Sequence, residues 1–289
     1  MSTRAKAEAL LVFITFIWGS TFVVVKGALA DASPLPFLAL RFIFAGALVF
    51  LALSRGKLDR RALLPGAVLG VSLFFGYLFQ TSGLVWTTPS KSAFITGFSV
   101  ILVPLLVMAQ GVRLRASNVG GALLGLAGLY FLVVPKGWQE VNRGDLLTLA
   151  GSAAFAVHIV LVGKYTRRFS FLHLVPVQIL VVGLFSAVAM PLDPGRSLHW
   201  TGRLLVALVV TAVFATGVAF SVQNWAQQYT PAAHTALIFA LEPVFAALSS
   251  RAVMGERLGG KVLLGCALIL GGMVVSEVWG GGAPSPVES

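Results

Sequence analysis

Long apolar runs, separated by short polar or charged segments, fill almost the whole chain. Crossing a bilayer as an α-helix takes about 20 mainly apolar residues, and runs of about that size recur along the sequence. The first run is longer than the apolar part of a signal peptide, about 7 to 15 residues, so we expect it to be retained. The pattern predicts transmembrane helices at 7–29, 36–53, 63–84, 91–110, 117–134, 146–163, 173–191, 204–227, 233–251 and 261–278.

The second half of the chain repeats the first. A shift of 143 residues aligns Gln80 with Gln223 and Trp86 with Tyr229. Each copy holds five predicted helices, and an odd number forces the two copies into opposite orientations in the membrane. The predicted fold class is an all-α integral membrane protein of ten transmembrane helices, arranged as two inverted five-helix repeats. The repeats span 7–135 and 144–279, and the small polar tail 280–289 is expected to be disordered.

Composition supports this class and bears on the partners. Hydrophobic residues make up 57% of the chain and charged residues only 11%, whereas soluble domains carry about 25% charged residues. A net charge of +11 would suggest nucleic acid in a soluble protein, but most Lys and Arg lie between apolar runs, as membrane-flanking charges do. We therefore expect a lipid bilayer and a small-molecule substrate as partners, and no nucleic acid.

The basic residues also predict the orientation in the membrane. In the first half, eight of them fall on one side of the membrane, against Lys91 alone on the other. Because basic loops stay in the cytoplasm, we expect both termini to be cytoplasmic. The second half is ambiguous, with basic residues on both sides. The eight are Arg4, Lys6, Arg55, Lys57, Arg60, Arg61, Arg113 and Arg115.

Polar residues within the predicted helices form one-sided stripes. Such residues are costly inside a membrane and usually face the bundle interior or a water-filled path. Those near the midplane are predicted to line a substrate cavity, the depth at which inverted-repeat transporters bind their substrates. Those nearer the surfaces are predicted to form gates or vestibules. The cavity set is Trp18, Thr21, Tyr77, Ser99, Phe155, His158 and Glu242, and the gate set is Arg41, Gln80, Thr81, Gln178, Gln223 and Asn224.

Several of these residues have a purely structural alternative. Trp18 could only fill space, and His158 could only hydrogen-bond a neighbouring helix. Lys26 and Arg41 could snorkel to the outer interface. Glu242, the only acidic residue in the middle of a predicted span, could couple transport to protons or hydrogen-bond a backbone carbonyl.

Two predicted helices contain a proline. Pro104 and Pro243 are expected to interrupt the fourth and ninth helices, since a proline inside a helix removes a backbone hydrogen bond. The carbonyl that Pro243 frees would be the acceptor for Glu242.

The fifth and tenth predicted helices carry glycines where the others carry polar side chains. Small residues let helices approach closely in lipid, so these helices are predicted to be packing struts or a weak homodimer surface, outside the transport path. The glycines are Gly120, Gly121, Gly125, Gly128, Gly265, Gly271 and Gly272.

Motifs for an enzyme or a cofactor site are missing from the sequence. The segment 255–261 imitates a phosphate-binding loop, but Val262 stands where a Ser or Thr must hold magnesium. Ser99 and His158 could nominally form an intramembrane protease pair, but no strained nucleophile turn accompanies them. With a single cysteine, Cys266, no metal-ligand spacing occurs. We expect no enzyme activity, no metal and no cofactor; a channel would need a ring of pore charges that the sequence lacks.

Three segments carry further motifs, WGSTFVVVK from Trp18, TPAAHTALIFALEPVFAAL from Thr230 and GERLGGKVLLGCALILGG from Gly255. Together with the duplication, they resemble the drug/metabolite transporter superfamily, above all its ten-helix EamA-domain exporters, which include the YddG-type amino-acid exporters. The resemblance covers Ala7 to Val278. The first repeat departs from it, with Ser99-Val100 in place of Glu-Pro.

The resemblance implies a multi-pass carrier of the bacterial inner membrane that exports amino acids and related small metabolites. It also implies alternating access, with the first four helices of each repeat around a central cavity. The alternative is a multidrug or organic-cation exporter coupled to protons. Because Glu242 alone is acidic in mid-span, we expect a facilitator that runs down the substrate gradient.

Overall fold

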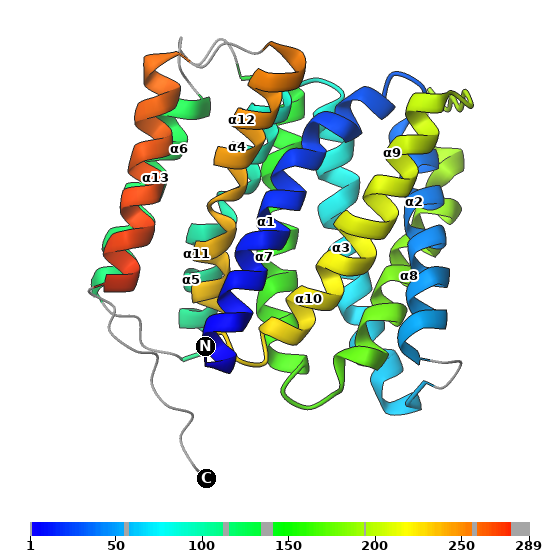
Figure 1. The fold of residues 1–289 in the computed structure, drawn as a ribbon, viewed down its shortest axis with the longest axis horizontal. Helices are drawn as coiled ribbons and strands as arrows, with labels where there is room; N and C mark the ends of the chain where they lie inside the picture. Colours follow the sequence, from blue (N-terminus) through cyan, green and yellow to red (C-terminus); the bar gives the residue numbers. More distant parts are fainter. Residues whose placement is uncertain are drawn as a thin grey trace.

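The protein is almost entirely helical (Figure 1). In this computed structural model, eight helical stretches of the described chain are long and apolar enough to cross a membrane, and two shorter apolar stretches lie at Val119–Gly128 and Gly260–Gly272. The all-α membrane class is therefore confirmed, whereas the number of ten helices stays a prediction. The tail 280–289 lies outside the described residues. Those residues are 2–54, 58–111, 116–133, 141–193, 195–255 and 259–278.

The first half of the chain supplies α1 to α6. Side-chain caps determine where two of these helices begin, because Ser2 accepts a hydrogen bond from the backbone of Ala5, and Thr88 accepts one from the backbone of Lys91. The helices are α1 (Thr3–Ala28), α2 (Pro34–Val49), α3 (Leu63–Leu84), α4 (Pro89–Thr96), α5 (Ser99–Ala109) and α6 (Ala116–Val133).

The second half supplies α7 to α13. A reciprocal capping box of Asn142 and Asp145 begins α7, which satisfies backbone N–H groups that a helix start leaves without partners. A π-helical segment, Val213–Val218, joins α9 to α10. The helices are α7 (Arg143–Tyr165), α8 (Phe171–Ala189), α9 (Gly202–Ala212), α10 (Ala219–Ala226), α11 (Ala232–Phe239), α12 (Glu242–Met254) and α13 (Gly260–Val278).

Two membrane crossings are broken near their middle, between α4 and α5 and between α11 and α12. Pro243 is the second residue of α12, where its missing N–H costs nothing. The prediction for Pro104 was wrong, because this proline lies inside α5 and the break falls at Gly97. A Cβ atom on Gly97 would lie 3.2 Å from Cγ of Pro243, so the two breaks pack against each other.

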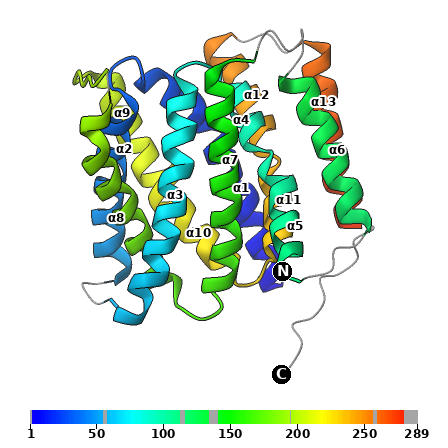
Figure 2. The same cartoon turned by 180° about the vertical axis from the view of Figure 1, so that it is seen from behind.

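Helices of the first half pack lengthwise on helices of the second half. Close pairs of this kind include α3 with α7, α2 with α8, α1 with α12, and α6 with α13 (Figures 1 and 2). Glycines bring the backbones of all four pairs close together; for example, a Cβ atom on Gly83 would lie 2.5 Å from the carbonyl oxygen of Gly144, and one on Gly128 would lie 2.6 Å from that of Gly265. Close approach of this kind is how helices associate without water.

The pair α6 and α13 stands at one edge of the bundle, beside α4, α5 and α11 (Figures 1 and 2). Its glycines face each other, since a Cβ atom on Gly272 would lie 2.5 Å from the carbonyl oxygen of Gly121. The same Cβ atom on Gly272 would lie 3.2 Å from the backbone nitrogen of Gly125, whereas a Cβ atom on Gly125 itself would lie 3.4 Å from Val100. The pair is thus closely packed, and a homodimer through it stays a prediction.

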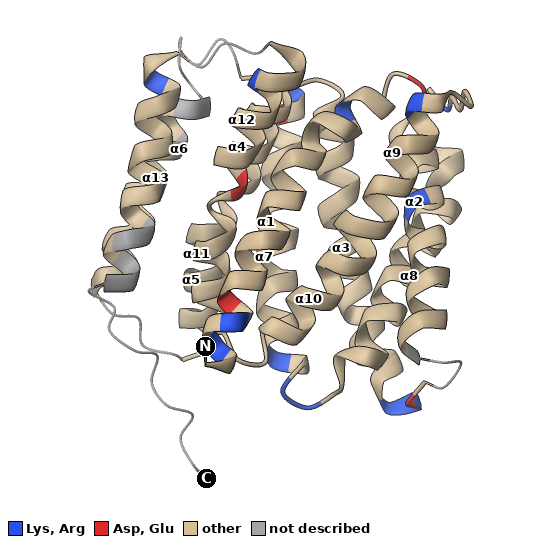
Figure 3. Ribbon diagram, viewed as in Figure 1, with Lys and Arg blue, Asp and Glu red and all other residues tan. Residues whose placement is uncertain are grey.

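Basic residues gather at both ends of the bundle and are scarce in its middle (Figure 3). The end at which α1 begins, hereafter the N-terminal end, carries Arg4, Lys6, Arg60, Arg61, Lys164, Arg167 and Arg168. The other end, hereafter the opposite end, carries Lys26, Lys91, Arg143, Arg203, Arg251 and Lys261. Arg55, Lys57, Arg113 and Arg115, on which the predicted orientation partly depends, lie outside the described residues.

Polar contacts tie the opposite end together. The Lys26 ammonium donates hydrogen bonds to the backbone carbonyls of Leu84, Val85 and Thr87, at 2.8 to 3.0 Å, so the expectation that it merely snorkels was wrong. Lys91 pairs with Asp145 at 2.6 Å, which links α4 to α7.

Asp31, in the turn between α1 and α2, pairs with Arg203 at the start of α9 at 2.7 Å and accepts a hydrogen bond from Thr201 at 2.8 Å. The hydrogen bonds from Arg203 and Thr201 lower the pKa of Asp31 from 3.8 to about 2. The carboxylate of Asp31 thus joins the turn after α1 to the start of α9.

Candidate functional site

A pocket lies in the middle of the bundle, at the two helix breaks. It contains about 720 Å³ of space free of atoms, counting the open solvent at its mouth. Thr96 and Ser99 line it from the first break, and Phe239 and Glu242 from the second. Both halves of the chain therefore contribute to the same pocket.

The pocket is displaced towards the opposite end. Its lining reaches Val25, three residues before the end of α1, and Leu84, the last residue of α3. Towards the N-terminal end, an apolar cluster that includes Leu11, Ile14 and Val103 fills the space between α1, α5 and α7. The site is thus closer to one mouth of the bundle than to the other.

The residues predicted from the sequence largely meet here. All seven predicted cavity residues line the pocket, and so do four of the six predicted gate residues, namely Arg41, Gln80, Thr81 and Gln223. Gln178 and Asn224 are not part of the lining. The Oε1 atom of Gln178 lies 2.8 Å from Nε2 of His158, and Asn224 donates a hydrogen bond to the carbonyl of Phe220. The gate role predicted for Gln178 and Asn224 therefore stays a prediction.

Some lining residues were missed by the polar stripes. Phe220 and Phe239 both line the pocket and stand 143 residues after Tyr77 and Thr96. Because polarity was the signal used, apolar members of the wall went unseen, although the repeat alignment points to them.

Arg41 is a buried cation on α2, with only 3% of the residue exposed. Its Nε atom donates a hydrogen bond to the hydroxyl of Thr216 at 2.9 Å, and its Nη2 atom lies 3.4 Å from both the hydroxyl of Tyr77 and the carbonyl oxygen of Ala215. Its guanidinium carbon lies 4.7 Å from the centre of the Tyr77 ring. The alternative that Arg41 only snorkels to the interface does not hold, since the side chain is buried inside the bundle.

The π-helical segment supplies two of these three acceptors. Ala215 and Thr216 both belong to it, and the indole N–H of Trp18 donates to the same Ala215 carbonyl at 2.8 Å. Segments of π-helix are rare and frequently occur at functional sites. Here the segment holds two pocket side chains, Arg41 and Trp18.

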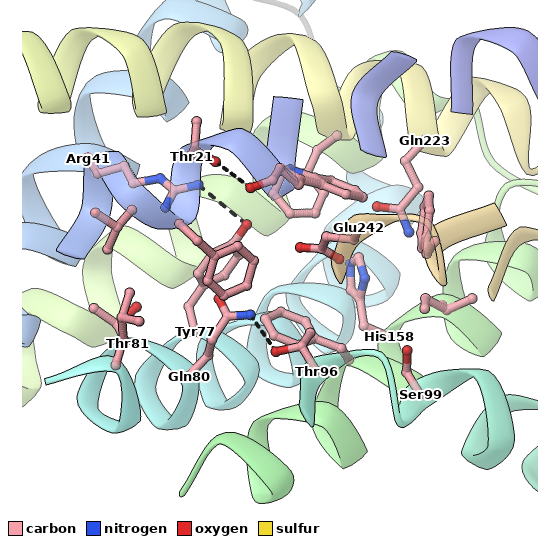
Figure 4. A pocket seen from close by; sticks show the side chains of 18 residues that line it. Thr21, Arg41, Tyr77, Gln80, Thr81, Thr96, Ser99, His158, Gln223 and Glu242 are labelled. Carbon is pink, nitrogen blue, oxygen red and sulfur yellow. Dashed lines mark hydrogen bonds between the residues drawn. The ribbon is translucent and has the colours of Figure 1, made fainter. Parts of the chain in front are cut away.

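Glu242 is the first residue of α12 and lines the pocket. A helix start favours negative charge, because its backbone N–H groups point outward. Gly19 of α1 packs closely against the start of α12, since a Cβ atom on Gly19 would lie 2.6 Å from the Glu242 carbonyl oxygen. In Figure 4 the carboxylate points into the pocket near His158 and Gln223. Within the described chain no residue hydrogen-bonds it, so the expected bond to a freed carbonyl is not formed.

Aromatic rings form much of the remaining wall. Trp18 contacts Phe220 and Phe239, with ring centres 5.5 and 5.1 Å apart, and Tyr77 meets Phe155 edge to face at 5.3 Å. Such tilted and edge-to-face pairs are the favoured aromatic arrangements. They give the pocket a rigid apolar surface beside its few charged and polar groups.

Two polar side chains of the wall are held by other helices. His158 shares its hydrogen bond with Gln178 of α8, which is the structural alternative considered for it, and it lines the pocket as well. Gln80 donates to the hydroxyl of Thr96 at 2.9 Å, next to the first break (Figure 4). Among the described residues, no group of three or more His, Cys, Asp or Glu side chains is placed to hold a metal ion.

Comparison with known proteins shows one family and one fold. The model of the EamA-like transporter family matches residues 5–134 and 142–277. An uncharacterized transporter of Archaeoglobus fulgidus is 35% identical over 273 residues, which cover 94% of this chain and 86% of the relative. A probable amino-acid metabolite efflux pump of Escherichia coli is 25% identical, with 96% and 95% covered. A protein of known crystal structure shares the fold, with a TM-score of 0.75, 24% identity, and coverage of 96% of this chain and 98% of that one.

Proposed function

The chain belongs to the EamA-like transporter family, and from that premise we propose that it exports amino acids and related small metabolites by alternating access. Its relatives are named as transporters, so the protein is a membrane transporter and not an enzyme. The observation that carries the proposal is the pocket at the two helix breaks, with a buried cation, a carboxylate and aromatic rings around it.

The proposed mechanism treats the two halves as inverted repeats that move against each other. The breaks support it, because they fall at 97–98 and 240–241, 143 residues apart, which is the shift that aligns the two halves. Broken helices at a central site are typical of inverted-repeat transporters. In this arrangement the contacts of Lys26, Lys91 and Asp31 form the gate at the opposite end, and the apolar cluster around Leu11 forms the gate at the N-terminal end.

Saturable exchange is the test of this function. In proteoliposomes, radiolabelled amino acids with apolar side chains should show saturable flux and counterflow, because a carrier exposes one site to each side in turn. A channel would pass substrate without counterflow. The proposal is wrong if no member of a panel of amino acids and related metabolites gives saturable flux.

We also propose that both termini are cytoplasmic, in a bacterial inner membrane. The charge bias of the first half supports this orientation. A fluorescent reporter fused after Ser289 should fluoresce in the cytoplasm, and an alkaline phosphatase fused there should be inactive. The reverse pattern would exchange the two gates.

An exporter of organic cations coupled to protons is the second candidate. Glu242 beside aromatic rings favours it, since aromatic faces and a carboxylate both attract cations. Arg41 disfavours it, because a second positive charge in the same pocket repels a cation. Flux without any proton gradient would support a facilitator, whereas uphill accumulation driven by an imposed pH gradient would support the coupled exporter.

A further inference from the structure

One basic and one acidic side chain, Arg41 and Glu242, line the same pocket, and neither has a charged partner within the described chain. No acidic side chain of the described chain pairs with Arg41, whose polar contacts are a hydroxyl of Thr216, a hydroxyl of Tyr77 and the Ala215 carbonyl. No basic side chain of the described chain pairs with Glu242. A buried charge without a counter-ion is costly, so such an arrangement needs a reason beyond folding.

The two charges do not neutralise each other across the pocket. The guanidinium of Arg41 is held on the side of α3 and the π-helical segment by Tyr77 and Thr216. Glu242 projects from the second helix break, and in Figure 4 the Tyr77 hydroxyl lies between the two. Arg41, Tyr77 and Glu242 all line this one pocket, so a small molecule bound in it can contact both end groups.

We infer that the pocket binds a zwitterion, with the carboxylate of the ligand on Arg41 and its ammonium on Glu242. This inference deepens the proposed function and depends on it for transport, although not for binding. An α-amino acid carries those two groups on the same carbon atom. Its side chain would then lie on the rings of Trp18, Phe155 and Phe220, so the favoured ligands are amino acids with apolar or aromatic side chains.

The physical reason for selectivity is the cost of an unmatched charge. An organic cation would satisfy Glu242 and leave Arg41 without a partner, and a carboxylic acid would do the reverse. Hydrogen bonds to charged groups contribute about 1.5–3 kcal/mol each, which corresponds to about 10- to 150-fold in affinity. Removal of either charge from the ligand should therefore weaken binding by at least about tenfold.

Three ligands separate the two contacts, because they share one aromatic side chain. L-phenylalanine carries both charges, phenethylamine only the ammonium and 3-phenylpropanoate only the carboxylate. Calorimetry on the purified protein in lipid nanodiscs should rank L-phenylalanine above both analogues by about tenfold or more.

Variants assign each charge to its residue. In Arg41→Gln, L-phenylalanine should bind no better than phenethylamine, while 3-phenylpropanoate stays weak. In Glu242→Gln, L-phenylalanine should bind no better than 3-phenylpropanoate. Arg41→Lys keeps the charge and should keep part of the preference for a carboxylate. Arg60→Gln makes the same change on an exposed residue at the N-terminal end and should leave all three affinities unchanged.

Other outcomes of these measurements would contradict the zwitterion inference. The zwitterion inference is wrong if the unmodified protein binds phenethylamine as tightly as L-phenylalanine. It is also wrong if Arg41→Gln and Glu242→Gln both rank the three ligands as the unmodified protein does. In that case counterflow of phenethylamine would still support a transporter. If none of the three ligands binds, the zwitterion inference is wrong, whereas saturable flux of another amino acid in the panel would still support the proposed function. Where Arg41→Gln does not fold, the ranking in Arg41→Lys and Thr216→Val decides, since both keep a buried side chain of similar size.

Discussion

The third membrane crossing is built differently in the two halves of the chain. In the first half it is one continuous helix, α3, whose Gly83 lets the backbone of α7 come into contact. In the second half, the π-helical segment Val213–Val218 interrupts the crossing, and Ala215 and Thr216 within it bind Trp18 and Arg41. Gln80 and Gln223 stand at matched positions on the two crossings and both line the pocket.

The difference shows what duplication allows. One copy of the crossing has the close glycine contacts that hold the two halves together, and the other presents a backbone carbonyl and a hydroxyl that hold the pocket residues Arg41 and Trp18. Packing and binding can therefore be altered separately. A change at a glycine of α3 should act on stability, and a change in the π-helical segment should act on the ligand.

The largest effect is expected for Gly83→Ala. The added Cβ atom would lie 2.5 Å from the Gly144 carbonyl oxygen and from the Thr148 hydroxyl, so α3 and α7 must separate. Overpacking of this kind costs about 1–3 kcal/mol, and thermal unfolding of the purified protein should show it. Gly217→Ala, in the π-helical segment, is the matched control, because its Cβ atom would lie 3.2 Å from a Val49 methyl group. Equal losses of thermal stability in Gly83→Ala and Gly217→Ala would contradict the idea that α3 serves packing and the π-helical segment serves binding.

Thr216→Val should weaken the binding of amino acids by about tenfold, the value of one hydrogen bond to a charged group. The hydroxyl that holds Nε of Arg41 is lost, while the shape of the side chain is kept. Calorimetry with L-phenylalanine measures the change. Thr81→Val makes the same substitution on α3 and should have a smaller effect, and the opposite order would place the carboxylate contact elsewhere.

A smaller loss is expected for Trp18→Phe. The ring contacts with Phe220 and Phe239 can be kept, but the hydrogen bond from the indole to the Ala215 carbonyl is lost. A neutral hydrogen bond contributes about 1 kcal/mol, or about fivefold in affinity. The concentration of substrate at half-maximal counterflow should rise by that factor. Trp200→Phe, at a position that is 61% exposed, should change nothing.

The smallest effect is expected for Asp31→Asn, at the start of the second crossing. Hydrogen bonds from Arg203 and Thr201 lower the pKa of Asp31 to about 2. A lowered pKa stabilises the folded state above the unfolded pKa of about 3.9, and this stabilisation is lost as the pH falls towards about 2. The unmodified protein should therefore unfold at a higher temperature than Asp31→Asn at pH 6, and this difference should shrink between about pH 4 and 2. It should be small, because Arg203 is 57% exposed and exposed ion pairs contribute little.

Asp59→Asn provides the control for that experiment. Asp59 caps the short turn before α3, and asparagine caps a helix equally well. The difference between Asp59→Asn and the unmodified protein should therefore stay constant across the same pH range. If the difference for Asp59→Asn shrinks with falling pH as it does for Asp31→Asn, the pH dependence is a general effect of acid on the protein and not a property of the Asp31 ion pair.

The sequence was sufficient to predict the class of fold and most of the pocket wall. Polar side chains inside a membrane are costly, so Trp18, Tyr77, His158 and Glu242 had to point inward, and helical spacing placed them at similar depth. The duplication predicted two matched helices around the centre, and the structure shows both of them broken.

The sequence was not sufficient to predict which side chains meet. The pairing of His158 with Gln178, and of Gln80 with Thr96, depends on how far neighbouring helices slide along each other, which no local pattern records. The π-helical segment has the same apolar character as its surroundings. The break in the fourth predicted helix was expected at Pro104, but α5 continues through this proline. The break lies instead at Gly97, where the absence of a side chain lets the two breaks pack together.

The ammonium of Lys26 links the position of α1 to the hydration of the pocket's nearer mouth. It donates to the carbonyls of Leu84, Val85 and Thr87, and the end of a helix leaves such carbonyls without partners of its own. When α1 moves away from α3, the ammonium and these carbonyls must all be solvated. Because a bare polar group is costly in an apolar setting, the two helices can part only as water enters between them. Wetting of this mouth and separation of the helices are then a single event.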